Sequence, residues 1–318
     1  MIEAASAEGT ALAWEVAAGL NARPRVLPCR LLYDSVGSAL FEAITLLPEY
    51  GLARADRKLL RQHAAAIGAA LPRPSVVVEL GAGSARKTRP VLAAIPGGFA
   101  YTAVDISPEA VRICRRALAE TPGMAAWRGV VAEFLPGLEQ AAAERRPGQR
   151  LTVFFLGGTI GNLSRDAAAG LLRGIHARLA PGDALLLGTD LEQNPARLLP
   201  AYDDAAGVTA AFNRNLLVRL RREMGAQMDP AGFAHEARWN AAERRMEMHL
   251  RAVGEQAIAI PEAGFACRLA DGESIWTEAS YKYTAQETRH LGATAGFEVV
   301  AQWRGEEWPA AETLFARN

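Results

Sequence analysis

The feature that most constrains the fold is a run of β-branched residues that ends in a glycine-rich turn. Residues 75–80 read Ser-Val-Val-Val-Glu-Leu, and Gly81, Ala82 and Gly83 follow them. Such a run is typical of a parallel strand that is buried on both faces. The glycines let the backbone turn tightly and approach a ligand closely. The pattern therefore predicts a central strand of an α/β sheet with a binding site at its carboxyl end.

The segments after this strand alternate between strand-like and helix-like patterns. The helices are expected at residues 108–118 and, after an N-cap at Ser164, up to Leu179. The further strands are expected at residues 101–105, 129–132, 151–156, 184–190, 298–303 and 312–316. This alternation predicts an α/β fold with a doubly wound parallel sheet.

About 90 residues in the second half of the chain interrupt this alternation. Asp203–Met224 has the spacing of one long helix, whereas residues from Met246 and residues 274–283 alternate as antiparallel strands do. Residues 1–54 are expected to be irregular, with short helices around residues 11–20 and 37–46 and a further helix starting near Asp56. The sequence thus predicts a Rossmann domain and a second α+β lobe. Their expected bounds are 57–193 and 285–318 for the former, and 1–56 and 194–284 for the latter.

Charge and composition argue against several classes of partner. The 318 residues carry 35 Lys+Arg and 35 Asp+Glu, so no positive excess attracts nucleic acid or an anionic membrane. The sequence shows no secretory signal and no apolar run long enough to span a membrane. Its three cysteines lie far apart, which favours reduced thiols in the cytoplasm. The five scattered histidines predict no metal site.

The glycine turn fits S-adenosylmethionine better than a dinucleotide. The GxGxxG spacing of dinucleotide sites is not met after Gly81. Asp105 ends the second strand 24 residues after Gly81, where a carboxylate can accept hydrogen bonds from both ribose hydroxyls. Taken alone, each feature has a plainer interpretation, a tight strand–helix connection for the turn and a helix-capping acid for Asp105.

Three further residues complete the expected cofactor site. Glu133 and Phe134 follow the third strand, where a carboxylate meets the adenine amino group and a ring stacks on adenine in the methyltransferase arrangement. Lys87 is either a solvated helix residue or the group that holds the cofactor's carboxylate. The predicted cofactor-binding residues are Gly81, Gly83, Lys87, Asp105, Glu133 and Phe134.

Long blocks of the sequence resemble one enzyme family. They are YDSVGSALFEAITLLPEY (33–50), LGGTIGNLSRDAA (156–168), GTDLEQNPARLLPAYDDAAGVTAAFNRNLL (188–217), RRMEMHL (244–250) and TEASYKYT (277–284). From about residue 25 to the C-terminus, the chain is similar to the histidine Nα-trimethyltransferases of ergothioneine biosynthesis. The resemblance implies an S-adenosylmethionine-dependent enzyme, a monomer, that converts L-histidine to Nα,Nα,Nα-trimethylhistidine (hercynine), the first step of that pathway.

Other functions remain open at this level. A relative of the same family acting on tryptophan or a histidine derivative is the nearest alternative. A non-catalytic small-molecule sensor fits less well because Gly81, Gly83 and Asp105 are intact. A nicotinamide oxidoreductase fits least, because the glycine spacing is wrong for a dinucleotide.

The resemblance also implies the residues of the substrate pocket. Aromatic residues of the N-terminal arm line the pocket. Two groups hold the substrate carboxylate: Asn162, in the loop after residues 151–156, and Tyr202. The implied substrate residues are Tyr33, Phe41, Tyr50, Gly157, Thr159, Asn162, Tyr202, Met248, Glu278 and Ser280. The implied catalytic residues among them are Tyr33, Asn162 and Tyr202.

Glu278 and Ser280 carry the physical argument for histidine. They are two residues apart on an expected strand, so their side chains leave the same face. Neutral imidazole has one N–H donor and one acceptor nitrogen, which a carboxylate and a hydroxyl complement. The pattern alone also fits a solvated strand face. Met248 is likewise either core or a group that packs on the imidazole ring, and the arm's aromatic residues are either core or a site for the product cation.

Overall fold

The computed structural model describes residues 2–318, which form two compact units. Unit 1 comprises Met1–Tyr50 and Asn194–Ser280, and unit 2 comprises Gly51–Gln193 and Tyr281–Asn318. Each unit is therefore built from two separate stretches of the chain, and each is described below by itself.

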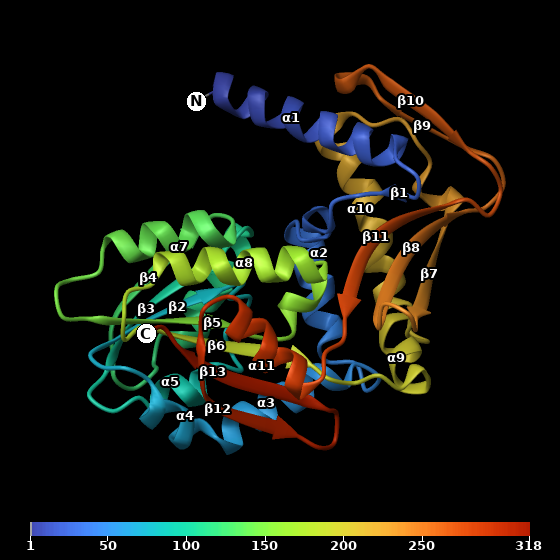
Figure 1. Cartoon of the computed structure of the whole chain (residues 1–318). Helices are drawn as coiled ribbons and strands as arrows, with labels where there is room; N and C mark the ends of the chain where they lie inside the picture. The colour runs from blue at the N-terminus through green and yellow to red at the C-terminus, as the bar shows by residue number, and fades with distance from the viewer. Residues whose placement is uncertain (1) are drawn as a thin grey trace. The chain divides into compact units, whose positions relative to one another are not determined.

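A seven-stranded sheet forms the centre of unit 2, in the order β12-β13-β6-β5-β2-β3-β4 (Figure 1). Strands β2 to β6 pair in parallel, which confirms the doubly wound sheet. Only the last strand differs from expectation: β13 runs antiparallel to both β6 and β12, so β12 keeps the direction of β6. A short connection joins β12 to β13, and short connections join antiparallel neighbours. The bounds are β2 Ser75–Leu80, β3 Phe99–Asp105, β4 Met124–Val131, β5 Arg150–Phe155, β6 Ala184–Asp190, β12 Glu298–Gly305 and β13 Ala310–Ala316.

Helices cover both faces of this sheet. One face carries α7 (Phe134–Ala143), α8 (Arg165–Arg178) and α11 (Ala285–Thr294), and the opposite face carries α3 (Gly51–Gln62), α4 (Ala64–Ala70) and α5 (Arg89–Ala93) (Figure 1). Helix α6 (Pro108–Leu118) contacts β3 and β4. The core between these layers is apolar and fully buried, and includes Val77, Phe154 and Leu186.

The start of α3 corrects the expectation from the sequence. The helix begins at Gly51 rather than near Asp56, and His63, whose φ of −105° is not helical, separates it from α4. Asp56 is 3 % exposed inside the helix. Its side chain is therefore a buried partner for another group and not a cap of the first turn.

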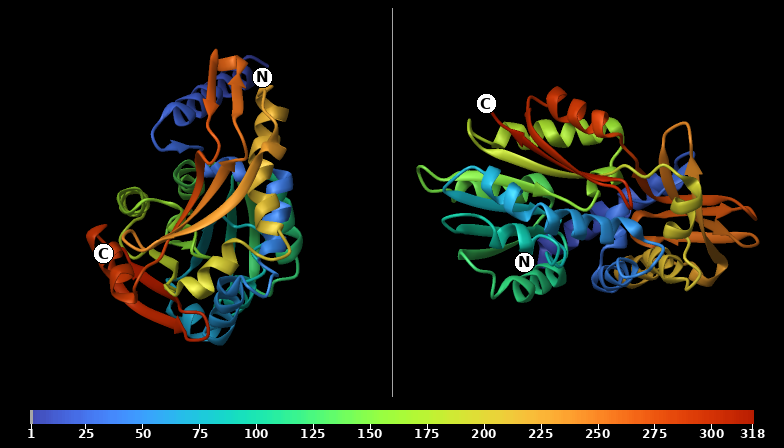
Figure 2. Two further views of the ribbon diagram at one scale, coloured as in Figure 1. Left: turned by 90° about the vertical axis from the view of Figure 1, so that its right-hand side faces the viewer. Right: turned by 90° about the horizontal axis from the view of Figure 1, so that it is seen from below.

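Unit 1 contains a four-stranded sheet in the order β1-β11-β8-β7 and a separate hairpin of β9 and β10. Helix α10 (Val208–Met224) packs against β7, β8 and α2 (Ser35–Ile44) (Figure 2). The antiparallel pairs β7–β8 and β9–β10 and the long helix confirm the α+β character expected of this lobe, whereas the short β1 pairs with β11 in parallel. The strand bounds are β1 Arg25–Val26, β7 Phe233–Asn240, β8 Arg245–Ala252, β9 Gln256–Ile260, β10 Phe265–Leu269 and β11 Ser274–Tyr281.

Two expectations for unit 1 were wrong in their bounds. The helix expected at Asp203–Met224 begins only at Val208 (α10), after Gly207 with a φ of 73°, and a separate helix that was not expected, α9 (Pro195–Tyr202), precedes it. The N-terminal arm, expected to be mostly irregular, begins with the long helix α1 (Ile2–Asn21). Among the helices of residues 2–318, none combines the length and apolar character needed to cross a lipid bilayer.

Candidate active site

The glycine turn of unit 2 lies where the chain reverses its direction of winding. It follows β2, whose neighbours in the sheet are β3 and β5, so it borders the crevice in which open α/β sheets bind ligands. Gly81 and Gly83 have φ values of 68° and 51°, which glycine adopts without steric cost. A Cβ on Gly81 would lie 3.6 Å from the Phe134 ring and 4.0 Å from Thr159 Cγ2. The turn after β2, the start of α7 and the loop after β5 therefore converge at one point.

Asp105 ties the ends of β2 and β3 together. Its Oδ2 accepts a hydrogen bond from Gly83 N (3.0 Å) and its Oδ1 accepts one from Ser107 N (2.9 Å). Burial raises the pKa of Asp105, and these backbone hydrogen bonds oppose that effect. A carboxylate offers about four lone-pair positions, so two backbone bonds leave it able to accept from a ligand. The turn and the carboxylate thus fit the ribose end of S-adenosylmethionine.

Glu133 and Phe134 lie at the start of α7. Glu133 is exposed at the N-cap position and makes no side-chain capping bond. Phe134 is half-buried and contacts Phe155 edge-to-face, with ring centroids 5.1 Å apart. A carboxylate and an aromatic ring therefore stand beside the glycine turn, as an adenine site requires. Their binding of adenine is a proposal.

The position of Lys87 does not match the solvated helix residue that was one of its two interpretations from the sequence. It lies in a turn before α5 rather than on a helix, and its Nζ contacts Asp56 Oδ2 at 2.8 Å. Burial alone would lower the pKa of Lys87, but the neighbouring Asp56 carboxylate raises it, so the amine stays charged. A Cβ on Gly157 would lie 2.3 Å from this ammonium. Lys87 therefore lies directly against the loop after β5.

That loop carries the other unit 2 residues predicted for the site. Gly157 and Gly158 adopt φ values of 78° and 71°, and a short 3-10 helix, η2 (Thr159–Asn162), follows. The Thr159 hydroxyl donates to the Leu156 carbonyl (3.0 Å), which fixes the turn. Asn162 ends η2 and is half-buried. Its binding of a substrate carboxylate stays a prediction.

The remaining predicted residues gather in unit 1 around a set of aromatic rings. Tyr33 follows η1 (Cys29–Leu32), Phe41 lies on α2, and Tyr202 ends α9. Their rings form a connected series of contacts with centroid distances between 5.6 and 6.4 Å. The contacting pairs are Tyr33–Phe41, Tyr33–Phe212, Phe41–Tyr50, Phe41–Phe212 and Tyr50–Tyr202.

Glu278 and Ser280 of β11 both contact this aromatic series. Tyr33 donates its hydroxyl hydrogen to Glu278 Oε1 (3.0 Å), and Tyr202 donates to Ser280 Oγ (2.7 Å). Burial and the Glu278 charge hold the pKa of Tyr33 well above its usual value, so Tyr33 remains a neutral donor. Both β11 side chains are nearly buried, at 8 % and 6 % exposure. They are therefore not the solvated strand face that the pattern alone allowed.

Met248 lies on the neighbouring strand β8. It is 2 % exposed, and its carbonyl accepts a hydrogen bond from the Thr277 hydroxyl (3.0 Å). This bond joins β8 to β11 one residue before Glu278. Contact of the Met248 side chain with a substrate ring stays a prediction.

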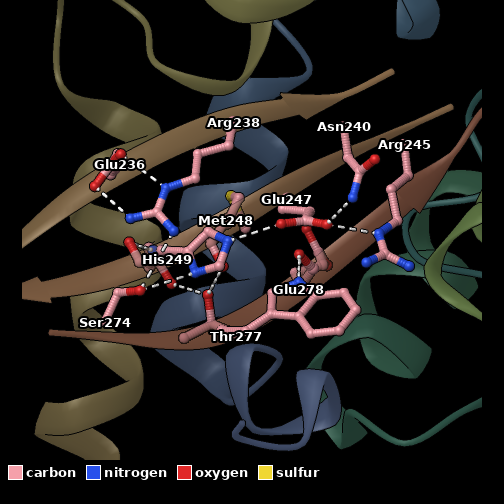
Figure 3. A network of polar contacts seen from close by, with 12 residues as sticks. Glu236, Arg238, Asn240, Arg245, Glu247, Met248, His249, Ser274, Thr277 and Glu278 are labelled. Carbon is pink, nitrogen blue, oxygen red and sulfur yellow. Dashed lines mark hydrogen bonds and ion pairs between the residues drawn. The ribbon is translucent and has the colours of Figure 1, made fainter. Parts of the chain in front are cut away.

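A polar network supports the same strand from β8 (Figure 3). The Glu247 carboxylate accepts from Arg245 Nε (2.7 Å) and lies 3.0 Å from His249 Nε2. The Arg245 guanidinium lies 4.5 Å from the centroid of the Trp276 ring. The Trp276 indole donates to the Glu278 carbonyl (2.7 Å). The network therefore fixes the backbone at the residue expected to contact the substrate.

Sequence reasoning missed four residues that the structure places with these groups. Phe212 lies within the helix expected at Asp203–Met224, but its contacts with Tyr33 and Phe41 depend on tertiary structure. Trp276 carried no motif. Asp56 was interpreted as a first-turn acid, and Glu312 was noted only as the start of a strand. Among the side chains of residues 11–318, no group of histidine, cysteine or acidic residues is arranged to hold a metal ion.

Comparison with known proteins agrees with the resemblance noted in the sequence. Residues 12–316 match a family model described as histidine-specific, S-adenosylmethionine-dependent methyltransferase. A histidine N-alpha-methyltransferase of Mycobacterium tuberculosis is 39% identical over 310 residues, which cover 96% of this chain and 95% of that protein. Its counterpart in Mycolicibacterium smegmatis is 40% identical over 304 residues, 94% of this chain and 93% of that protein. The ergothioneine biosynthesis protein 1 of Neurospora crassa is 30% identical over 299 residues, which cover 88% of this chain and 32% of that longer protein. This chain belongs to the family of histidine-specific, S-adenosylmethionine-dependent methyltransferases.

Proposed function

We propose that this chain methylates the α-amine of L-histidine three times with S-adenosylmethionine and so forms Nα,Nα,Nα-trimethylhistidine, the first step of ergothioneine biosynthesis. The observation that carries the proposal is the nearly buried Glu278–Ser280 pair, which lies among aromatic rings and receives one tyrosine hydroxyl on each member. The two relatives named histidine N-alpha-methyltransferase, which match nearly the whole chain, support the same substrate.

The pair suits the two nitrogens of neutral imidazole. The Glu278 carboxylate can accept from the imidazole N–H as well as from Tyr33, because a carboxylate has about four lone-pair positions. The Ser280 hydroxyl accepts from Tyr202, and a hydroxyl that accepts one bond can still donate another to the acceptor nitrogen. A substrate without these groups would leave a nearly buried carboxylate facing an apolar ring, which is costly.

The unit 2 residues suit the cofactor. We assign the ribose to Asp105, the adenine to Glu133 and Phe134, the close backbone approach to Gly81 and Gly83, and the amino-acid carboxylate to Lys87. When bound, S-adenosylmethionine supplies a methyl group made electrophilic by the attached sulfonium.

The protein's contribution to the reaction is mostly orientation. Asn162 and Tyr202 hold the substrate carboxylate, so the neutral amine is aimed in a fixed direction, and such alignment accounts for a large part of the barrier reduction. Each methyl transfer releases a proton from the amine, and this proton can leave through water or through the Tyr33 or Tyr202 hydroxyl. The trimethylated product is a permanent cation, and the rings of Tyr33, Phe41 and Tyr50 attract it by roughly 0.5–2 kcal/mol each.

A tryptophan-specific enzyme of the same family is the alternative, and Glu278 distinguishes the two. Replacing Glu278 with Ala removes the acceptor for the imidazole N–H and enlarges the pocket. We expect kcat/KM for histidine to fall about tenfold to a hundredfold, from a loss of ~1.5–3 kcal/mol. Activity on tryptophan should fall less, or rise.

The measurement is the ratio of kcat/KM for histidine to that for tryptophan, in the parent and in Glu278→Ala. Ser274→Ala is the matched control, because Ser274 lies at the other end of β11 and contacts Arg238 and His249 but none of the rings around Glu278 and Ser280. An equal ratio in parent and Glu278→Ala would mean that Glu278 does not recognise the side chain.

A cytoplasmic monomer without nucleic-acid or membrane partners completes the proposal. The free cysteines Cys29, Cys114 and Cys267 support a reducing compartment. Light scattering of the purified protein tests the monomer, and a mass of twice 34.0 kDa would contradict it.

A further inference from the structure

A nearly buried carboxylate in unit 2 holds the amine of Lys87. Asp56 Oδ2 lies 2.8 Å from Lys87 Nζ, and the Asp56 side chain is 4 % exposed. The Lys87 side chain keeps 28 % of its surface accessible to solvent, although its amine contacts the nearly buried Asp56. An ammonium has three N–H donors, so one bond to Asp56 does not exhaust its capacity.

A second carboxyl group lies against the first. Glu312 of β13 is 2 % exposed, and its carboxyl group interacts with that of Asp56. Asp56 Oδ1 and Glu312 Oε2 are both buried, and no donor group within residues 11–318 reaches either oxygen. Two buried carboxyl groups can bond to each other only if one of them carries a proton. A bond between Asp56 and Glu312 therefore requires one shared hydrogen.

The charges of the neighbours decide which carboxyl group is neutral. Burial and the negative charge of Asp56 raise the pKa of Glu312 well above its usual range. Burial acts against ionisation of Asp56 too, but Lys87 and the hydrogen bond from Glu312 bring the pKa of Asp56 below its usual value. Glu312 is thus the neutral donor, Asp56 the anion and Lys87 the cation.

Two glycines close the space around this triad. A Cβ on Gly157 would lie 2.3 Å from Lys87 Nζ, and a Cβ on Gly188 would lie 2.8 Å from Glu312 Oε1. Lysine has a flexible stem, and a ligand that has to order it loses binding free energy to the lost rotamer entropy. Here the protein orders the stem in advance, with its amine against the loop after β5.

We infer that Asp56 and Glu312 act as one singly protonated pair that positions the Lys87 ammonium for the carboxylate of the cofactor's amino-acid end. The inference rests on the proposed role of Lys87 in cofactor binding and adds two positioning residues to it. The triad carries no net charge before the ligand binds, which avoids the cost of an isolated buried ion. The two carboxyl groups have different tasks: Asp56 supplies charge, and Glu312 supplies a hydrogen.

Calorimetric binding of two ligands tests this division of roles. S-adenosylmethionine carries the carboxylate, whereas methylthioadenosine keeps adenine and ribose but lacks it. We expect Lys87→Met and Asp56→Asn each to weaken S-adenosylmethionine binding roughly tenfold to a hundredfold, as loss of a charged hydrogen bond does. Glu312→Gln should change it by less than about threefold, because the amide N–H replaces the carboxyl O–H as donor to Asp56. Methylthioadenosine should bind all three variants as it binds the parent.

The outcomes distinguish a failure of the Asp56–Glu312 positioning role from a failure of the proposed binding role of Lys87. Unchanged S-adenosylmethionine binding in Lys87→Met would refute the assigned role of Lys87 itself. If Lys87→Met binds S-adenosylmethionine weakly and Asp56→Asn binds it normally, only the positioning role of Asp56 is refuted. Equal losses in Glu312→Gln and Asp56→Asn would show that Glu312 is ionised, and parallel losses for methylthioadenosine would show a merely structural role.

An infrared spectrum gives a second readout that does not depend on Asp56→Asn folding. At neutral pH the parent should show a protonated-carboxyl C=O band that Glu312→Gln lacks. Glu79 provides the reference, because burial raises its pKa to about 7 while it accepts hydrogen bonds from Thr88 and Tyr101. The protonated-carboxyl band of Glu79 should remain in Glu312→Gln and should disappear at higher pH. An identical band in parent and Glu312→Gln would overturn the shared proton.

Discussion

Asp105 illustrates how one side chain can serve the fold and a ligand together. Its two oxygens accept backbone hydrogen bonds from Gly83 and Ser107, so the carboxylate holds the glycine turn to the end of β3. The helix-capping interpretation and the ligand interpretation of this acid are therefore compatible. The same bonds give the oxygens a fixed orientation before a ribose arrives.

We expect Asp105→Ala to weaken S-adenosylmethionine binding by ~1.5–3 kcal/mol per charged hydrogen bond lost, and Asp105→Asn to weaken it less. Asparagine retains one acceptor oxygen for Gly83 or for the ribose. Isothermal titration calorimetry measures both. Glu109→Ala is the control, since its exposed ion pair with Arg112 contributes only about 0–1 kcal/mol. Normal cofactor affinity in a folded Asp105→Ala would refute the assignment.

At the scale of elements, helix α2 depends on the acid that precedes it. The Asp34 Oδ1 accepts from Gly37 N (2.7 Å) and from Asn215 Nδ2 (2.8 Å), and Oδ2 pairs with Arg222 (2.6 Å). Asp34 thus caps α2 and binds it to α10. Because Tyr33 is its chain neighbour, the cap also fixes one end of the aromatic series.

Asp34→Ala should lower the free energy of unfolding by about 1–3 kcal/mol, through loss of the cap and of the buried acceptors. Although burial opposes ionisation, Arg222 and the Gly37 and Asn215 hydrogen bonds hold the pKa of Asp34 below its usual value. The carboxylate's contribution is then complete above the unfolded pKa of about 4 and is lost as the pH falls through the lower folded value.

Urea unfolding at neutral and acid pH checks both statements. Asp34→Asn keeps the acceptor for Gly37 but cannot titrate, so the gap in stability between parent and Asp34→Asn should narrow as the solution is acidified. If the difference in free energy of unfolding between parent and Asp34→Asn stays constant as the pH falls, Asp34 is not charged in the folded protein.

The sequence predicted the elements whose signal is local. Strand β2 and helix α6 have the bounds expected from their apolar runs and caps. The start of α10 at Val208 rather than at Asp203 was missed, and Gly207, with a φ of 73°, marks it. The antiparallel placement of β13 was missed because strand direction depends on pairing with β6, which no residue of β13 encodes by itself.

The candidate site divides in the same way. Glu278, Ser280 and the arm's aromatic residues were named from the sequence blocks, and the structure places them together within unit 1. Asp56 and Glu312 had no such sign, because an acid on a helix or strand usually faces water. Their roles follow only from burial and mutual contact, which are tertiary properties.

At the scale of the molecule, the chain passes between the units after Tyr50, Gln193 and Ser280. On the unit 2 side, all three passages lie beside Asp190. Its Oδ2 contacts Lys282 Nζ (2.6 Å), and its Oδ1 accepts from the Trp308 indole (2.9 Å), against whose ring Gly51 packs. A single buried cluster therefore anchors every connection.

Lys282→Met should destabilise the protein by about 3–5 kcal/mol, because it leaves Asp190 buried without its cation. Lys282 is 0 % exposed and Asp190 is 3 % exposed. Lys58→Met is the matched control, since the exposed Lys58–Glu307 pair contributes only about 0–1 kcal/mol. Guanidinium unfolding gives both values. Equal effects for the two lysines would show that the buried pair contributes no more than a surface pair.

Because unit 1 is built from two separate stretches of the chain, its parts are synthesised at different times. Tyr33 and Glu278 are separated by 245 positions, and Arg25 and Glu273 by 248. At a synthesis rate of ~5–20 residues per second, the arm leaves the ribosome on the order of 10–50 s before its partners do. During that wait, the Tyr33 hydroxyl has no Glu278 carboxylate to bond to. A messenger cut short before codon 278 yields a chain in which the cofactor-side glycine turn is complete but Glu278 and Ser280 were never made.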